Sequence, residues 1–212
     1  VGQFSDNKLN GQGTFTWADG RKQEGQWVDD EFDEASLGDS SADTVERESA
    51  EDADIQYKLG IIHLRGNGVP VDKAKAGQLF ISSAEQGHVD AQFNLGVMYH
   101  KGDGLSLNHS EGVKWHKKAA AQGSPDAHYA LASSYFNGRG VAESDAEAVK
   151  WLRSASELGH LEAQGHLALS YALGRGVTKD VGKALRLWRE PAVQCDTHSQ
   201  WNLAQAYYNG LG

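Results

Sequence analysis

The chain repeats itself every 36 residues from about residue 52 to its C-terminus, and this period limits the possible folds more than any other feature. Three columns of similar residues recur at this spacing. The leucine column is Leu59, Leu95, Leu131, Leu167 and Leu203. The aromatic column is His63, Tyr99, Tyr135, Tyr171 and Tyr207. The glycine pairs are Gly66/Gly68, Gly102/Gly104, Gly138/Gly140, Gly174/Gly176 and Gly210/Gly212. A fixed period of this length predicts stacked supersecondary units, each burying the apolar face of its neighbour.

Each unit is predicted to contain two helices. The first helix starts beside an acidic column, which suits the positive end of the helix dipole. In the third unit Ser124 is a favourable cap and Pro125 occupies the first helical position. The acidic column is Asp54, Asp90, Asp126 and Glu162. We expect this helix to end at the first glycine of each pair, because glycine readily adopts the left-handed conformation found there.

The second helix is predicted to start at a column of N-cap residues, Asp72, Asn108, Ser144 and Asp180. Glu111 and Glu147 stand three residues further on and predict complete capping boxes. Glycines at 87, 123 and 159 should end this helix. Pro191 interrupts the fourth copy, and a proline within a helix removes a hydrogen bond and clashes with the preceding turn. We therefore expect a kinked or shortened helix there.

Two segments carry the columns most completely, AQFNLGVMYHKGDG…EGVKWHKKAAAQG at 91–123 and AHYALASSYFNGRGVAESDAEAVKWLRSASELG at 127–159. They resemble Sel1-like repeats (SLR), relatives of the tetratricopeptide repeat. The resemblance covers residues 52–212, about four and a half repeats. It implies an all-α fold, a right-handed α-solenoid of helix-turn-helix repeats. His63, Leu105, Pro191 and Cys195 depart from the pattern.

Residues 1–28 have a different pattern, with regularly placed glycines among Phe15, Trp17 and Trp27. Ala18-Asp19-Gly20 predicts the turn of a β-hairpin. The segment resembles a MORN repeat, although Gln23 stands where that family usually has tyrosine. The resemblance to MORN repeats implies membrane association. The segment, however, carries few cations that would bind a membrane surface. Because the pattern begins incompletely at Val1, we expect a trimmed chain that could have lost a targeting segment.

Residues 29–51 are predicted to form an acidic linker, which could also dock on the solenoid. Twelve acids and one arginine lie between residues 29 and 54, whereas the whole chain has a net charge of −9. The remainder is therefore nearly neutral, and no basic face predicts nucleic acid as a partner.

No motif in the chain predicts a catalytic centre, a cofactor or a metal site. The nine histidines lack metal-ligand spacing, and Cys195 is the one cysteine. The stretch GRGVTKD at 174–180 superficially resembles a phosphate-binding loop, but a helix is predicted before it and Asp180 caps the next helix. We therefore expect a chain that is not an enzyme.

Repeat arrays of this type bind partners on a concave face, which the first helices are expected to line. Aromatic residues with a few cations there would make an anchor set for a peptide or loop. The alternative is that the aromatic residues pack between repeats and the cations are merely solvated. The candidate partner-binding residues are Tyr57, Lys58, Arg65, Phe93, Asn94, His100, Lys101, Tyr129, Phe136, His166, Trp201 and Tyr208.

The sequence hypothesis is a non-catalytic scaffold or adaptor that binds another protein. Two alternatives follow from the resemblances. One is a bacterial immunity protein that neutralises a secreted, type VI-like toxic effector such as a phospholipase. The other is a membrane-associated adaptor that uses the MORN unit. The sequence leaves the compartment open between bacterial cytoplasm and periplasm.

Overall fold

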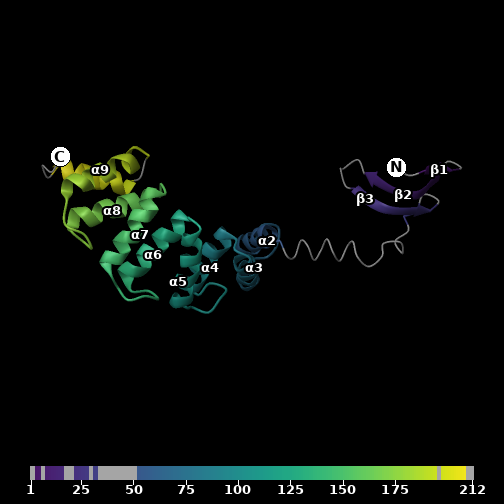
Figure 1. The fold of residues 1–212 in the computed structure, drawn as a ribbon, viewed down its shortest axis with the longest axis horizontal. Coiled ribbons are helices and arrows are strands. Elements are labelled where there is room, and N and C mark those ends of the chain that lie inside the picture. The colour runs from purple at the N-terminus through teal and green to yellow at the C-terminus, as the bar shows by residue number, and fades with distance from the viewer. Residues whose placement is uncertain are drawn as a thin grey trace. The chain divides into compact units, whose positions relative to one another are not determined.

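The computed structural model describes residues 3–5, 8–16, 22–28, 31–32, 52–194 and 197–208 (Figure 1). The chain divides into two units, Val1–Asp52 and Ala53–Gly212. In the first unit, strands β1 (Gln3–Ser5), β2 (Lys8–Thr16), β3 (Lys22–Val28) and β4 (Glu31–Phe32) pair antiparallel with their sequence neighbours. The β2–β3 register places Gly13 opposite Gly25. The predicted turn at 18–20 and residues 33–51 of the predicted linker lie outside the described residues, whereas β4 falls within that linker.

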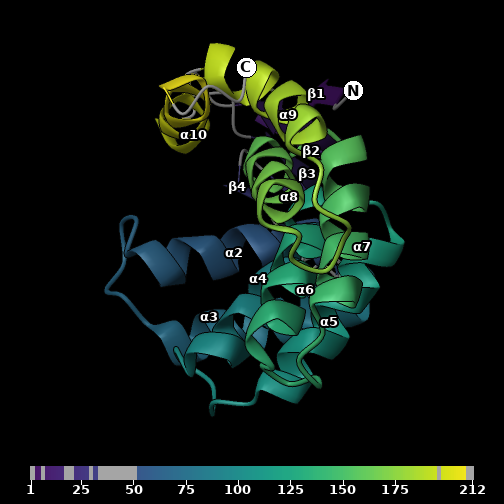
Figure 2. The same ribbon diagram turned by 90° about the vertical axis from the view of Figure 1, so that its left-hand side faces the viewer.

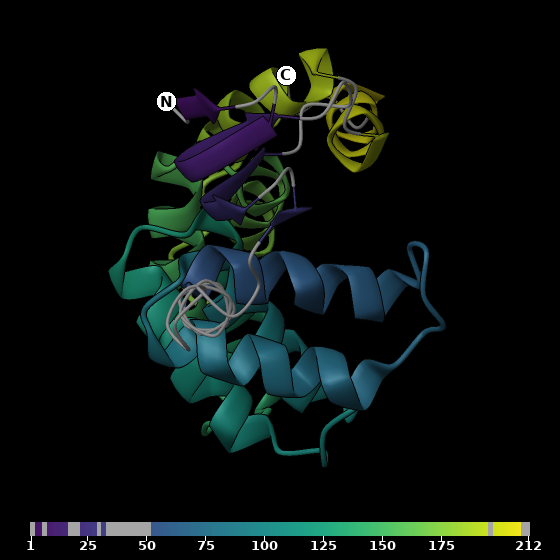
Figure 3. The same cartoon turned by 90° about the vertical axis from the view of Figure 1, so that its right-hand side faces the viewer.

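The second unit is built of helices that alternate with short loops (Figures 1 and 2). Figure 3 shows α2 and α3 side by side, joined at one end by the loop of residues 66–72. Each helix makes its main contacts with the helices before and after it. The helices are α2 (Ala53–Arg65), α3 (Lys73–Glu85), α4 (Val89–Lys101), α5 (His109–Ala121), α6 (Pro125–Asn137), α7 (Asp145–Glu157), α8 (Leu161–Leu173), α9 (Val181–Val193) and α10 (Thr197–Tyr208).

The predicted helix ends are confirmed where they depend on local hydrogen bonds. The side chains of Asp72, Asn108, Ser144 and Asp180 each accept a hydrogen bond from the backbone N–H three residues on. Ser124 caps α6, with Pro125 as its first residue. The first glycines of three pairs end α4, α6 and α8 in the left-handed conformation, at Gly102, Gly138 and Gly174.

The prediction of complete capping boxes is wrong in its second half. Asn108 and Ser144 accept from the N–H groups of Glu111 and Glu147 as expected. The N–H groups of Asn108 and Ser144, however, donate to the carbonyls of Tyr99 and Tyr135 in the preceding helix. The glutamates are left to pair with Lys114 and Lys150 on the helix surface.

Of the expected kink or shortening of the second helix in the fourth repeat, the shortening is wrong, because α9 contains 13 residues and is as long as α3, α5 and α7. Pro191 is fully buried in a column otherwise occupied by Ser83, Ala119 and Ala155. Its ring therefore keeps a packed environment inside the repeat. After Pro191, the last turn of the helix is completed by a hydrogen bond from the Gln194 N–H to the Glu190 carbonyl.

The core of the second unit lies between successive helices and follows the repeat columns. Leu95, Leu131 and Leu167 are buried in the first helices. Facing them, one column of the second helices supplies a large buried side chain in every repeat, namely Phe80, His116, Leu152 and Trp188. A histidine thus occupies a hydrophobic core position in the second repeat.

Candidate partner-binding surface

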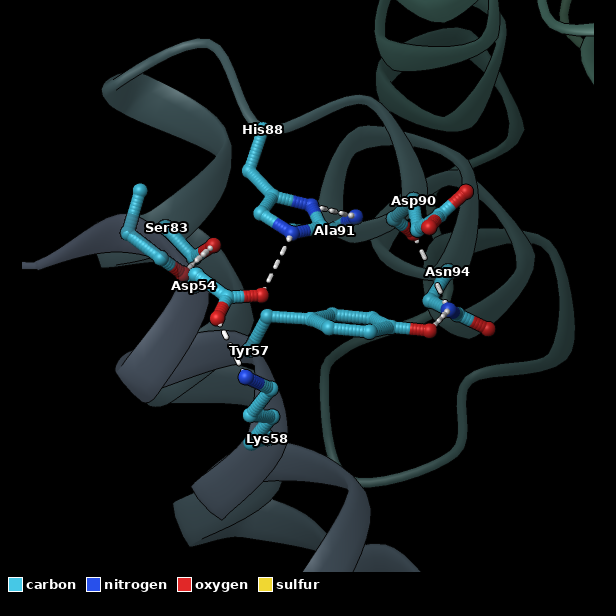
Figure 4. A network of polar contacts seen from close by, with 9 residues as sticks. Asp54, Tyr57, Lys58, Ser83, His88, Asp90, Ala91 and Asn94 are labelled. Atoms are coloured by element: carbon cyan, nitrogen blue, oxygen red, sulfur yellow. Dashed lines mark hydrogen bonds and ion pairs between the residues drawn. The ribbon is translucent and has the colours of Figure 1, made fainter.

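The first predicted binding residue, Tyr57, lies in a polar network that joins the first two repeats (Figure 4). Its ring stacks on His88, with centroids 4.5 Å apart. Its hydroxyl accepts a hydrogen bond from Asn94 at 3.4 Å. Lys58 donates to Asp54, whose other carboxylate oxygen lies 3.7 Å from Nε2 of His88. Tyr57, Lys58 and Asn94 therefore all take part in contacts within or between repeats.

His88 also forms the N-cap of α4, where its Nδ1 accepts a hydrogen bond from the Ala91 N–H at 3.3 Å. This function requires an unprotonated Nδ1. Sequence analysis did not identify it, although the position is equivalent to Ser124, which was recognised as a cap. Histidine is not among the preferred N-cap residues, so residue preference alone does not indicate this function.

The network recurs 72 residues later, between the third and fourth repeats. Tyr129 stacks on His160 with centroids 4.7 Å apart. Nδ1 of His160 accepts from the Ala163 N–H at 3.1 Å, and its Nε2 lies 3.3 Å from Asp126. Burial raises the pKa of both Tyr57 and Tyr129 above the ordinary tyrosine value. These half-buried phenols are therefore neutral packing groups.

The second repeat replaces this network with a row of stacked rings. Phe93 stacks on His116 at 5.6 Å, His116 on His100 at 5.2 Å, and His100 on His109 at 5.2 Å. Nδ1 of His100 lies 3.1 Å from Nδ1 of His109. Burial, together with the nearby charge of His100, lowers the pKa of His116 from 6.5 to about 4. Burial also lowers the pKa of His100.

Three predicted residues, Tyr129, Phe136 and His166, line one pocket formed mainly by α6 and α8. The pocket has a volume of about 200 Å³. Leu173, in its wall, is 66% exposed. The Arg175 guanidinium lies 4.4 Å above the Phe136 ring, and its Nε donates to Asp145 at 2.8 Å. The remaining wall is formed by Ser133, Asn137, Leu152, Leu169 and Ser170.

The other predicted residues do not line this pocket. Arg65 and Lys101 are exposed at the C-terminal ends of α2 and α4. Trp201 and Tyr208 are exposed on α10, at 66% and 87%. The structure thus brings part of the predicted set together and spreads the rest along the repeats.

The part of the chain that the structure describes holds no group of three or more histidine, cysteine, aspartate or glutamate side chains placed to bind a metal ion. Within the same residues, none of the helices combines the length and hydropathy of a transmembrane span.

Paired helices with a 36-residue period, stacked through capped loops, define an α-solenoid of helix-turn-helix repeats. The Sel1 repeat model matches residues 53–88, 89–124, 125–160, 161–190 and 197–212, and the chain belongs to the Sel1 repeat family. The MORN repeat model matches residues 1–20. Sel1-repeat proteins generally act as non-catalytic scaffolds for protein–protein interaction.

Two solved structures share about a third of their aligned residues with this chain. One, an SLR-fold protective antigen of uropathogenic Escherichia coli, is 35% identical, with a TM-score of 0.72 over 74% of this chain. The other, a Sel1 repeat protein from Oxalobacter formigenes, is 33% identical, with a TM-score of 0.73 over 81% of this chain. The chain spans 34% and 66% of their respective lengths.

Cysteine rich protein B from Helicobacter pylori has the same fold at 19% identity, with a TM-score of 0.51 over 65% of this chain and 100% of its own. The comparison with curated proteins gave no match.

Proposed function

We propose that this protein is a non-catalytic scaffold that holds a partner protein on the first-helix face of its repeats. The observation that carries the proposal is the pocket between α6 and α8, where Tyr129, Phe136 and His166 converge. A volume of about 200 Å³ is smaller than the roughly 300 to 1,000 Å³ typical of pockets for drug-sized ligands. It suits one large apolar side chain projecting from a partner loop or helix.

Leu173 gives the pocket an apolar rim that the other repeats lack. The equivalent positions are occupied by Arg65, Lys101 and Asn137. A leucine that is 66% exposed contributes little to folding, and an exposed apolar residue beside a partly apolar pocket is typical of a protein-binding surface. Arg175, stacked on Phe136, adds a cation that could contact polar groups around the inserted side chain.

The described residues show no feature particular to a toxic effector as partner or to a membrane surface. The immunity and membrane hypotheses are therefore not carried into this proposal. The proposal names only the class of partner, which is a protein with an exposed apolar anchor.

Two matched substitutions test the proposal. Leu173→Lys recreates the residue at position 101, and Leu107→Lys, at a 61% exposed position away from the pocket, recreates the residue at 179. Partners should be isolated from the source organism with the wild-type chain, identified, purified and measured by calorimetry. We expect Leu173→Lys to weaken binding at least about tenfold, the loss of one buried apolar anchor, and Leu107→Lys to leave it unchanged. Equal affinity for wild type and Leu173→Lys would refute the pocket as the docking site.

A further inference from the structure

The phenolic oxygen of Tyr171 is shared by two cationic side chains from different helices. Nη2 of Arg153 in α7 donates to it at 3.1 Å, and Nζ of Lys183 in α9 donates at 2.8 Å. The Lys183 ammonium also lies 4.3 Å from the centre of the Tyr171 ring. Within the described part of the chain, neither cation forms an ion pair with a carboxylate. Two positive charges therefore meet at one neutral oxygen.

Comparison of the repeats shows that this arrangement belongs to the fourth one. The positions equivalent to Lys183 in the second and third repeats are Glu111 and Glu147, which pair with Lys114 and Lys150. In the fourth repeat the second member of that pair is Arg186. An ion pair on the helix surface has thus been replaced by two cations of like charge, an arrangement that is unfavourable by itself at this spacing.

A pocket of about 440 Å³ is lined by Tyr171 and Lys183, and Arg153 reaches the Tyr171 oxygen without lining the pocket itself. Lys179 adds a second cation to its lining, and Thr178 adds a hydroxyl group. Asp180 is the acid in the lining, and its Oδ1 already accepts the Lys183 N–H at 2.8 Å as the cap of α9. The remaining lining residues are Tyr171, Val177 and Lys183.

We propose that this pocket binds an oxyanion, a carboxylate or phosphate group, with Lys183 of its lining as the principal ligand and Arg153, at the same Tyr171 oxygen, as a second cation. Charge-assisted hydrogen bonds from a guanidinium and an ammonium to one oxyanion are about twice as strong as bonds to a neutral acceptor such as the Tyr171 hydroxyl. The anion would also reduce the repulsion between Arg153 and Lys183, which meet at the Tyr171 oxygen. The same cations hold the pKa of Tyr171 below its ordinary value, with the Lys183 hydrogen bond as the largest cause. None of these side chains lines the pocket between α6 and α8. The test of the oxyanion site is therefore independent of the test of partner docking there.

Nuclear magnetic resonance of the isotope-labelled full chain tests the site directly. The chain is titrated with inorganic phosphate and, separately, with a short glutamate peptide, at constant ionic strength. We expect saturable shifts of the backbone amides of residues 177–183 with at least one probe. A response to phosphate alone identifies a phosphate site, and a response to the peptide identifies a carboxylate site. Absence of saturation with both probes would overturn the proposal.

Lys183→Glu restores the residue of the second and third repeats, so we expect it to fold and to bind the probe at least about tenfold more weakly. Arg153→Gln removes the other cation from a different helix and should weaken binding to a similar extent. Lys75→Glu makes the same charge change at the equivalent position of the first repeat, where His63 replaces the tyrosine. It should leave binding unchanged. If Lys75→Glu weakens binding as much as Lys183→Glu does, the effect is one of net charge and the site does not exist.

Discussion

At the scale of single residues, His116 is the least expected side chain, because it fills a core position that phenylalanine, leucine or tryptophan fills in the other repeats. Among the described residues, neither of its ring nitrogens finds a hydrogen-bond partner of ordinary geometry, although the Phe93 backbone opposes the fall in pKa. A Cβ at Gly96 would lie 2.2 Å from the ring, which explains the glycine there. The site accommodates a neutral imidazole and disfavours an imidazolium.

The free energy of unfolding should therefore depend on pH through His116. Its pKa is about 4 in the folded chain and 6.5 in the unfolded chain, so the unfolded state binds the proton more readily. Stability is complete above pH 6.5 and falls as the pH drops toward 4, by about 3 kcal/mol in all. Urea unfolding at pH 7 and pH 4.5 measures the loss. His116→Leu, which recreates Leu152, should reduce the loss, whereas His166→Leu on the surface should not. An undiminished loss in His116→Leu would contradict this assignment.

The histidine cap of α8 gives a second prediction at this scale. His160→Ala removes the acceptor for the Ala163 N–H together with the stack on Tyr129 and the contact with Asp126. His160→Ser recreates the Ser124 cap and loses only the stack and the Asp126 contact. We expect the alanine variant to be less stable than the serine variant by about 1 kcal/mol, the usual contribution of an N-cap. Thermal unfolding of both variants at one fixed pH compares the two. Equal stabilities would show that the cap contributes nothing.

At the scale of the elements, the paired glycines have two different functions. The first glycine of a pair ends a helix in the left-handed conformation, as Gly138 does at φ +62°. The second glycine touches the preceding repeat. A Cβ at Gly140 would lie 2.3 Å from the carbonyl oxygen of His109, the first residue of α5, and Gly104 and Gly176 approach Lys73 and Asp145 as closely. Gly68 has φ +78° but nothing within 4 Å of such a Cβ.

Alanine at these two positions should separate backbone strain from contact between repeats. Gly68→Ala introduces only the left-handed conformation of a non-glycine residue, about 1 to 2 kcal/mol. Gly140→Ala carries the same strain and also pushes against a backbone carbonyl, so we expect it to cost at least about 2 kcal/mol more. Urea unfolding of both variants gives the difference. If both variants lose the same free energy of unfolding, the repeats tolerate separation at this contact.

At the scale of the whole molecule, the second unit is a chain of nearest-neighbour contacts. Each helix packs mainly on the one before and the one after it, and α10 contacts α9 while exposing Trp201 and Tyr208. The stability of such an array is a sum over repeats and their interfaces, and it need not be uniform. We expect α10, which leaves Trp201 and Tyr208 exposed, to open more often than helices whose apolar residues are buried.

Hydrogen exchange of the full chain, followed by mass spectrometry, should show this gradient. We expect the amides of α10 to exchange at least about tenfold faster than those of α4 to α7, which corresponds to an opening free energy lower by about 1.4 kcal/mol or more. Gly140→Ala, at the junction of the second and third repeats, should raise exchange near α5 and α6 more than in α9. Uniform protection of the amides along the array, in the wild-type chain and in Gly140→Ala alike, would contradict the nearest-neighbour description.

The sequence alone determined the features that depend on a few consecutive residues. The repeat period, the glycine C-caps and the aspartate, asparagine and serine N-caps all follow from bonds that close within about four residues. Ser124 and Pro125 were therefore predictable without a structure. Pro191 shows the limit of such reasoning, since a local rule predicted a kinked or shortened helix, whereas α9 keeps 13 residues and buries the proline.

The tertiary structure decided which side chains meet between helices. The N-cap amides of Asn108 and Ser144 bind tyrosine carbonyls nine residues earlier, so their capping boxes remain half formed. Tyr57 and Tyr129 stack on the histidine N-caps of α4 and α8, and Arg153 and Lys183 reach one oxygen from two helices. These contacts depend on how one helix is rotated against another, which is determined by the packing of the whole interface. The period identified the columns, and only the packed helices showed which columns touch.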